Sequence, residues 1–308
     1  MRAKIACLVI TAIACTHAYA ACEDKFAAGV GPRIEVKADL NKATFICYDF
    51  YAVMTSGVTR TALWSAEHLT AESVEEAHSI KRVDSFHPDE NIPPDDRAEL
   101  ADYKHSGWDQ GHNSPSGDQP TAESQYQSFS LANMVPQNPD NNRHLWQGVE
   151  ISGRALAKYD GDIYEVTGPL FIGTRGRIGG RVEVPNYMWK AIYDPKRGAG
   201  VYVTRNAAGD AFSIISVADF ILISGIDPFP ALDSVTKQRV FNLPAPRPSG
   251  QKLDAGPVSE AALGLGGEVS SVDGPVTELG GETTGYARRS AEHIARHTAW
   301  QVVKHALY

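Results

Sequence analysis

The sequence predicts an α+β fold, because segments typical of strands and segments typical of helices occur along the same chain. Residues 45–55 and 60–69 are two β-type runs separated by a turn that contains Gly57, as expected of a hairpin. Further strands are predicted at 163–167, 182–193 and 200–204. Residues 139–159 instead carry apolar side chains at helical spacing, so a helix is predicted there.

The first 20 residues are expected to be a signal peptide. Arg2 and Lys4 precede an apolar run, and residues 18–20 (AYA) form a small-residue cleavage site. The run is too short for a stable membrane span. We therefore expect export, either to the periplasm or as a secreted protein. The alternative is a lipoprotein with Cys15 as the lipidated residue.

Cleavage at that site would leave two cysteines, Cys22 and Cys47. Two cysteines in an exported protein most often form a disulfide, and two free thiols are the alternative. Cleavage would also remove Arg2 and Lys4, which changes the net charge from −8 to about −10. An acidic protein is not an obvious partner for a polyanion, and this argues against tight, processive nucleic-acid binding.

The remaining elements follow from local composition. Residues 70–77 could be one helical turn or a solvated loop, and residues 87–96 read as a proline-broken acidic loop. In the predicted helix Asp140 is the expected N-cap, and Gly148 and Gly153 each cost about 1 kcal/mol relative to alanine. Residues 212–223 are strongly apolar, and residues 230–238 suit a short helix.

One folded domain is expected over residues 21–243. Residues 244–285 are rich in proline, glycine, serine and glutamate, which is typical of a disordered linker. Residues 286–308 have helical periodicity and are predicted to form a C-terminal helix.

Three short segments carry the chemistry: DQGH (109–112), ANMVPQ (132–137) and NRHLWQGVE (142–150). Within them His112, Asn142 and Glu150 offer a base, a neutral oxygen ligand and a carboxylate. This set suits hydrolysis of a phosphodiester with one hydrated magnesium ion. Asn142, Trp146 and Glu150 recur every four residues, so a regular helix would place them on one stripe.

These segments resemble the active site of the ββα-metal (His-Me finger) family of DNA/RNA non-specific endonucleases, the endonuclease G-like group. In that family the pattern reads D-R-G-H, then S-N-x-x-P-Q, then N-x-x-x-W-x-x-x-E. The resemblance covers residues 45–242 and includes TALWSAEHLT (61–70), RVDSF (82–86), TGPLF (167–171) and VPNYMWKAI (184–192). Gln110 is the departure, because the family usually has arginine at that position.

The resemblance implies an α+β, ββα-metal fold with a central antiparallel sheet flanked by helices, in which the motif helix carries Asn142 and Glu150. It implies His112 as the general base, Asn142 as the direct Mg²⁺ ligand, and Glu150 as an acceptor for the waters around the ion. Mn²⁺ should substitute to some degree. The alternatives are a helix-capping role for Asn142 and an exposed helix carboxylate for Glu150. Asn133 is expected to orient His112 or a strand turn, and Trp146 to pack in the core.

The family also has an arginine that contacts the scissile phosphate, and Arg82 lies at that position. Lys81 and Arg97 are the other candidates, and a plain surface charge is the alternative. Gln110 can still donate a hydrogen bond to substrate, although it lacks a cation that would contribute about 1–3 kcal/mol.

Residues 173–181 form a glycine-rich basic turn that carries Arg175 and Arg177. This turn is expected either to lie near substrate phosphates or to be simply solvated. The sequence has no aromatic ladder, so base stacking of single strands is not predicted.

The sequence thus predicts an exported, Mg²⁺-dependent endonuclease with DNA and RNA as substrates and 5′-phosphate products. The main alternative is a nucleic-acid-binding protein on the same fold, catalytically weakened by Gln110. A serine esterase is disfavoured because no G-x-S-x-G elbow occurs. The oligomeric state is left open, and a dimer is possible.

Overall fold

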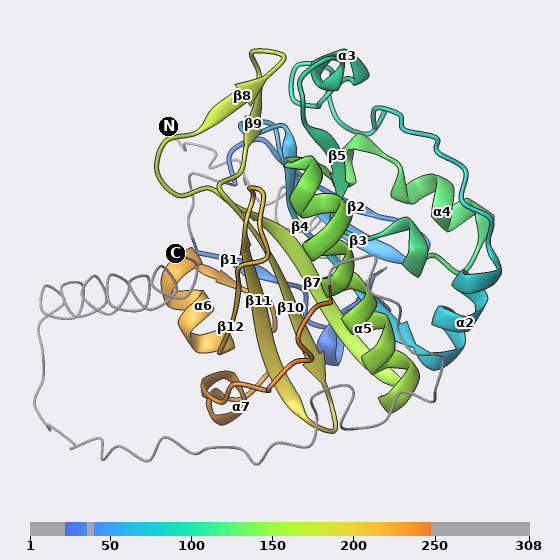
Figure 1. Cartoon of the computed structure of the whole chain (residues 1–308), viewed down its shortest axis with the longest axis vertical. Coiled ribbons are helices and arrows are strands. Elements are labelled where there is room, and N and C mark those ends of the chain that lie inside the picture. The colour runs from blue at the N-terminus through green and yellow to red at the C-terminus, as the bar shows by residue number, and fades with distance from the viewer. Residues whose placement is uncertain (1–21, 36–39, 248–308) are drawn as a thin grey trace, which may run out of the picture.

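The computed structural model describes residues 22–35 and 40–247 (Figure 1). The predicted signal peptide (1–20), the C-terminal helix (286–308) and most of the linker (244–285) lie outside the described residues. The centre of the fold is a seven-stranded antiparallel sheet of order β12-β11-β10-β7-β4-β3-β2. Its strands are β2 (Ala43–Cys47), β3 (Tyr51–Ser56), β4 (Thr61–Thr70), β7 (Asp162–Leu170), β10 (Tyr187–Asp194), β11 (Gly198–Arg205) and β12 (Phe212–Ile215).

Three two-stranded ribbons and several helices surround this sheet (Figure 1). The ribbons are β1 (Arg33–Ile34) with β13 (Ile226–Asp227), β5 (Asp109–His112) with β6 (Met134–Gln137), and β8 (Gly176–Ile178) with β9 (Val182–Val184). The α-helices are α2 (Ala71–Ser79), α3 (Leu100–Tyr103), α4 (Ala122–Ser128), α5 (Gln147–Asp160), α6 (Val217–Ser224) and α7 (Ser234–Gln238). Short helical turns cover Glu23–Lys25, Ala27–Gly29, Ser116–Asp118 and Leu131–Asn133, and a π-helix covers Asn141–Trp146.

The predicted hairpin is present as β3 and β4, but the run 45–55 is two strands rather than one. The chain reverses after β2, where the Tyr48 amide donates to the Tyr51 carbonyl at 2.9 Å. Aromatic side chains continue through this turn, so the sequence pattern does not mark it.

Local capping explains three elements that composition alone left open. Thr70 and Ser73 form a capping box, and the acidic stretch 70–77 is therefore the start of helix α2. Ser216 accepts from the Asp219 amide and divides the apolar run 212–223 into strand β12 and helix α6. Asp233 caps α7, so the predicted short helix is confirmed over Ser234–Gln238.

Both faces of the sheet are covered. On one face, a core that includes Trp64, Trp189 and Phe220 packs beneath α6 and the N-terminal turns. On the other face, Leu69 and Ile163 pack against apolar side chains of α2 and α5. The second face also carries a row of buried polar side chains, which lies behind the candidate site.

The chain stays packed on the body beyond residue 243. The Tyr202 hydroxyl donates to the Pro244 carbonyl at 2.6 Å, and Pro244 and Pro246 are buried. The Arg247 backbone lies against Gly148, where any Cβ would overlap it. Gly148 is thus required in the helix by this close approach, despite its low helix propensity. Within the described residues, no helix is long and apolar enough to cross a membrane.

A disulfide joins Cys22 to Cys47, with a Cα–Cα distance of 6.0 Å. Cys22 is fully buried in the core beneath Trp64, and Cys47 ends β2. The bond therefore connects the N-terminal segment to an edge strand of the central sheet.

Replacing both cysteines with serine is expected to lower the free energy of unfolding by about 3–4 kcal/mol, because the bond closes a loop of 25 residues in the unfolded chain. Urea denaturation with and without a reductant measures the effect. The wild-type protein should lose stability on reduction, whereas the double variant should not respond. Equal stability of wild type and double variant would contradict the prediction.

Candidate active site

The candidate site is built on the β5–β6 ribbon and the helix that follows it. Antiparallel pairing places Gln110 opposite Pro136 and His112 opposite Met134. The glycine of the DQGH segment is needed for packing, because a Cβ on Gly111 would overlap the Gln137 side chain. Gln137 in turn donates to Asn141 at 2.8 Å, which ties the ribbon to the first turn of the helix.

The helix begins at Pro139, and its N-cap is Asn138 rather than the predicted Asp140. Asn138 Oδ1 accepts from the Asp140 amide at 3.0 Å and from the Asn141 amide at 3.3 Å. Proline is well suited to the next position because the missing N–H would have no helical partner there. Asp140 instead accepts from the Gly209 amide and contacts His144. A capping role for Asn142 is also excluded by this arrangement.

A π-helical turn over Asn141–Trp146 changes which side chains face the site. The regular spacing predicted one stripe for Asn142, Trp146 and Glu150. In the structure Asn142 and Glu150 line a cavity together with Gln147, whereas Trp146 is fully buried in the core. The π turn accommodates extra residues per turn and rotates Trp146 away from its neighbours. The expected core role of Trp146 is confirmed.

Asp109 orients the Asn142 side chain. Asn142 Nδ2 donates to Asp109 Oδ2 at 2.9 Å, and this bond fixes the amide so that Oδ1 remains as its ligand atom. Arg143 holds the same carboxylate through two bonds, from Nε at 2.8 Å and from Nη2 at 2.6 Å. The bidentate pair anchors Asp109 and brings a guanidinium to the cavity beside Gln110.

His112 lies in an aromatic setting at the end of β5. Its ring contacts Phe86 and Phe129 at centroid distances of 5.7 and 4.9 Å. Burial, together with the Arg82 charge, lowers the pKa of His112 to about 3. Its Nε2 is buried without a hydrogen-bond partner among the described residues, and the side chain is part of the cavity lining.

Arg82 reaches the same cavity from the loop after α2. It donates to Asp84 at 2.7 Å and to the Ser116 hydroxyl at 2.9 Å, and it lies 5.1 Å from the Phe129 ring centroid. Its side chain is 56% exposed, so it remains open to solvent. The structure therefore brings Arg82 together with His112, as the motif predicted.

Asn133 is a positioning residue and lies outside the cavity lining. It is fully buried, and its Oδ1 accepts from Ser65 at 2.8 Å and from the Ser114 amide at 2.9 Å. Its Nδ2 donates to the carbonyls of Ser114 and Ser128. Asn133 thus fixes the turn that follows His112, and its amide atoms are occupied by these partners rather than open to substrate.

Glu150 and Arg154 complete the cavity from α5. Burial raises the pKa of Glu150 to about 7, and the nearby Arg154 charge opposes that rise. Arg154 donates to the buried Asp118 at 2.5 Å. Burial acts against its charge, yet Asp118 and Glu150 together raise the pKa of Arg154. The motif reading missed Arg154, although its position four residues after Glu150 is the signal that could have found it.

Behind this cavity lies a second group of carboxylates. Glu67, Asp118 and Glu165 have oxygen atoms within 4.8 Å of one another. The fully buried Lys190 forms an ion pair with Glu165 and lies 3.8 Å from Glu67. Its ammonium already supplies a cation there, so this group reads as a charge-compensated structural cluster and fits a metal less well than the open cavity does.

Of the other residues predicted to bind substrate, only Gln110 lines the His112 cavity, which has a volume of about 560 Å³. Arg97 does not reach it, because Arg97 is bound to Glu90 and Glu99 and its side chain is only 12% exposed. Arg175 and Arg177 both donate to the Glu183 carboxylate. Burial acts to raise the pKa of Glu183, but the two guanidiniums outweigh it, so the pKa is lowered.

The site combines a two-stranded ribbon that carries His112 with a following helix that presents Asn142, and both lie against an antiparallel sheet. This arrangement defines the ββα-metal class of nuclease fold. A crystal structure of the EndoG/EndoGI complex contains a similar chain, with a TM-score of 0.55 and 24% identity, covering 62% of this chain and 88% of that one. At this identity the likeness supports the fold.

Comparisons at the sequence level identify the family as well as the fold. A model of the DNA/RNA non-specific endonuclease family matches residues 29–221. Nuclease C1 of Cunninghamella echinulata var. echinulata is 35% identical over 214 residues, which are 62% of this chain and 85% of that protein. The mitochondrial nuclease EXOG of Homo sapiens is 31% identical over 217 residues, 63% of this chain and 59% of that protein. The chain belongs to the DNA/RNA non-specific endonuclease family, and the resemblance drawn from the motif is confirmed.

Proposed function

We propose that this nuclease is an exported, metal-dependent enzyme that hydrolyses phosphodiester bonds of both DNA and RNA and leaves 5′-phosphates. The observation that carries the proposal is the single cavity lined by His112, Asn142 and Glu150. Export is supported by the sequence of residues 1–20 and by the disulfide, which suits an oxidising compartment.

Asn142 and Glu150 would hold the metal. The Asn142 carbonyl oxygen and a carboxylate are hard donors of the kind that Mg²⁺ prefers, and Asp109 keeps the amide oriented for this purpose. A bound Mg²⁺ would supply Lewis-acid stabilisation of the charge that develops on the phosphoryl oxygens. Mn²⁺ prefers similar ligands and should substitute.

His112 would accept the proton of the attacking water. Its low pKa keeps the imidazole neutral at physiological pH, so its base form is always present. The aromatic walls of Phe86 and Phe129 hold the ring in place. The water would attack phosphorus as its proton passes to His112, the bond to the 3′-oxygen would break, and a second water would donate the proton that the leaving 3′-oxygen needs.

The guanidiniums of Arg82, Arg143 and Arg154 would bind the scissile phosphate and the phosphates next to it in the substrate strand. Arg143 lines the same cavity as Gln110, the position where the family motif has an arginine, and it is bound to the adjacent Asp109. We therefore infer that Arg143 supplies the cation that Gln110 lacks, and that the enzyme is active in spite of this departure.

Cleavage of supercoiled plasmid and of structured RNA by the purified protein tests the function, in Mg²⁺, in Mn²⁺ and in EDTA. The proposal expects both substrates to be degraded only with metal, and the DNA fragments to be ligatable through their 5′-phosphates. Folded protein that binds nucleic acid but cleaves neither substrate would favour the weakened binding protein instead.

Asp109→Asn is expected to lower activity about 10- to 100-fold at limiting Mg²⁺, because the single uncharged oxygen of an amide cannot hold Asn142 and both Arg143 donors at once. The measurement is the Mg²⁺ concentration that gives half-maximal cleavage, which should rise. Glu75→Gln is the matched control, since Glu75 pairs with Lys158 on the outer surface, away from the cavity. An unchanged Mg²⁺ requirement in Asp109→Asn would contradict the orienting role.

A further inference from the structure

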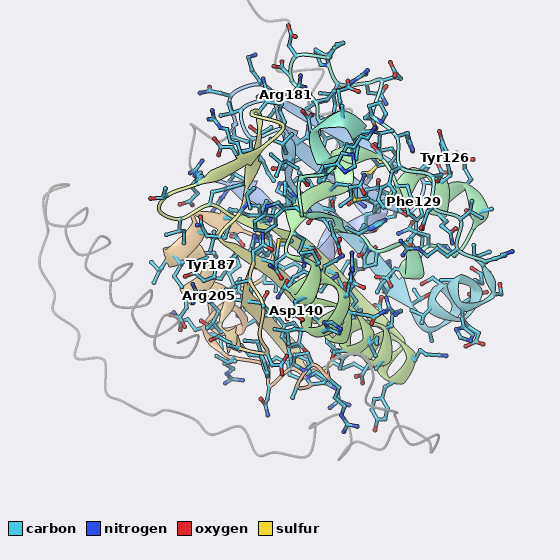
Figure 2. The ribbon with its side chains drawn as sticks, turned by 45° about the horizontal axis from the view of Figure 1, so that its top comes forward. Tyr126, Phe129, Asp140, Arg181, Tyr187 and Arg205 are labelled. Carbon is cyan, nitrogen blue, oxygen red and sulfur yellow. A yellow bond between two sulfur atoms is a disulfide. The ribbon has the colours of Figure 1, made fainter. Side chains whose placement is uncertain are left out.

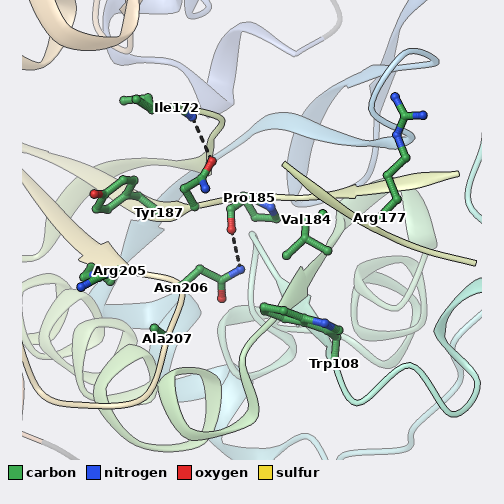
Figure 3. A pocket seen from close by; sticks show the side chains of 11 residues that line it. Trp108, Ile172, Arg177, Val184, Pro185, Tyr187, Arg205, Asn206 and Ala207 are labelled. Atoms are coloured by element: carbon green, nitrogen blue, oxygen red, sulfur yellow. Dashed lines mark hydrogen bonds between the residues drawn. The ribbon is translucent and has the colours of Figure 1, made fainter. Parts of the chain in front are cut away.

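A second cavity lies next to the catalytic one and has no role in the mechanism above. Its volume is about 470 Å³, and it is lined by the β8–β9 ribbon, the ends of β10 and β11, and Trp108. Tyr187 and Arg205 face each other in register across β10 and β11 at its wall (Figure 2). In Figure 3, Trp108 and Arg205 stand on opposite sides of the cavity, with Asn206 between them.

The lining combines an aromatic surface with positive charge. Trp108 is half-buried, whereas Trp64, Trp146 and Trp189 are fully buried, so Trp108 alone among the tryptophans of residues 22–35 and 40–247 can offer a ring face to a ligand. Arg177 and Arg205 line the cavity, and its lining includes no acidic residue. Indole and guanidinium groups together suit the base and the phosphates of a nucleotide.

Hydrogen bonds preform the walls of this cavity. Asn206 donates to the carbonyls of Pro136 and Pro185, both at 2.9 Å. Asn186 accepts from the Ile172 amide at 3.1 Å and donates to the Thr174 carbonyl at 3.0 Å. These amides are occupied by backbone partners, so they shape the cavity and leave recognition to Trp108 and the arginines. A volume of this order suits one small organic ligand.

The two cavities are directly connected through the backbone. Trp108 lines one cavity and Asp109 lines the other, and a single peptide bond joins them. Asn206 also accepts from the Asn138 amide at 2.7 Å, and Asn138 caps the helix that carries Asn142. A polynucleotide that places one phosphate at His112 can therefore reach the second cavity with a neighbouring residue of the same strand.

We infer that the second cavity is an accessory subsite for one unpaired nucleotide of the substrate strand, with its base against Trp108 and its phosphates towards Arg177 and Arg205. The inference rests on the proposed function for the substrate class. Arg175 and Arg177 share the one carboxylate of Glu183, so the ribbon keeps a net positive charge in an otherwise acidic chain. A nucleotide base must leave its stack to enter the second cavity. The subsite should therefore contribute more to the binding of single-stranded regions than to the binding of intact duplex.

Binding of a fluorescein-labelled oligothymidylate of about a dozen nucleotides, measured in EDTA, tests the subsite. Trp108→Leu keeps an apolar side chain against the buried cluster that includes Met134 and Val184 but removes the aromatic face. This variant is expected to bind about 5- to 150-fold more weakly, whereas Trp108→Phe should bind nearly as the wild type does. Saturation with an unlabelled oligomer should quench the tryptophan fluorescence of the wild type and not that of Trp108→Leu.

Turnover of bis(4-nitrophenyl) phosphate separates this inference from the proposed function, because such a small diester occupies only the catalytic cavity. All Trp108 variants should hydrolyse it at the wild-type rate. Tyr159→Ala removes an exposed aromatic ring of α5 outside both cavities and should leave oligomer binding unchanged. Wild-type oligomer affinity in Trp108→Leu, or unquenched wild-type fluorescence at saturation, would overturn the subsite. Wild type that binds with quenching but hydrolyses no diester would refute the function alone.

Discussion

Replacing His112 with alanine is expected to lower the rate of phosphodiester cleavage by about 10²- to 10⁴-fold while the protein remains folded. Among the described residues, His112 is the one histidine in the lining of the cavity, and the aromatic rings around it cannot accept a proton. Initial rates on plasmid and RNA at saturating Mg²⁺ measure the loss, and circular dichroism verifies the fold.

His144→Ala is the matched control for this prediction. His144 lies on the same π-helical turn as Asn142, but its Nδ1 contacts Asp140, and it does not line the cavity. Its replacement should leave activity near the wild-type level. Near-normal cleavage by His112→Ala would remove the assigned base and with it the mechanism.

The low pKa of His112 leads to a second prediction, which concerns the pH dependence of the cleavage rate. Because burial and Arg82 lower that pKa to about 3, the free enzyme keeps its base form as pH falls from 8 to 5. The pH profile of kcat/KM at saturating Mg²⁺ should then lack the loss near pH 6.5 that an ordinary histidine would give. A clear inflection at that pH that persists in variants of the other titratable groups would show that His112 is solvated in the working enzyme.

The parts of the site that are close in sequence could be predicted from the motif. His112 and Gln110 lie on one short strand, and Asn142 and Glu150 lie on one helix, so local spacing was enough to bring them together. Strand runs of the central sheet were also visible, because their side chains have the residue types and spacing of a half-buried sheet. The predicted strand 182–193, however, is divided into β9 of the β8–β9 ribbon and β10 of the central sheet.

Features that depend on contacts distant in sequence could not be predicted in this way. The π turn that separates Trp146 from the cavity depends on Asn141, which is held by Gln137 and faces Thr204. The second cavity joins Trp108 to Arg205 across nearly 100 residues of chain. Helical and strand periodicity describe one element at a time, so neither arrangement leaves a local signal.

Glycine gave a misleading local signal for the same reason. Gly148 and Gly153 argued against a helix, yet both lie within α5. Any Cβ on Gly153 would overlap the Glu165 carboxylate, and one on Gly148 would overlap the Arg247 backbone. Tertiary packing thus requires residues that helix propensity disfavours.

The row of polar residues beneath the site is the clearest case of an unpredicted feature. Register places Glu67 opposite Glu165 on β4 and β7, and Lys190 opposite Thr167 on β10. All four side chains are buried. Burial and neighbouring carboxylates raise the pKa of Glu67, and burial raises that of Glu165 despite Lys190. Burial also acts against the charge of Lys190, but Glu165 and Glu67 raise its pKa.

Lys190→Met is therefore expected to lower the free energy of unfolding by about 3–5 kcal/mol, because it leaves buried carboxylates without their cation. Urea denaturation at neutral pH measures this loss. Lys158→Met is the control, since Lys158 pairs with Glu75 at the surface and its loss should cost at most about 1 kcal/mol. The double variant Lys190→Met/Glu165→Gln should recover part of the stability, because it removes one of the uncompensated charges.

Lys190→Met also tests whether the buried group of Glu67, Asp118 and Glu165 affects catalysis. Asp118 belongs to the buried group through its proximity to Glu67 and Glu165, and it also holds Arg154, which lines the cavity beside Glu150. Loss of the Lys190 cation raises the energy of an ionised Asp118 and weakens its hold on Arg154. Activity of Lys190→Met should therefore fall under conditions where it is still folded, and Glu165→Gln in the same chain should restore it in part. A stable and fully active Lys190→Met would show that the cluster is neutral without its lysine.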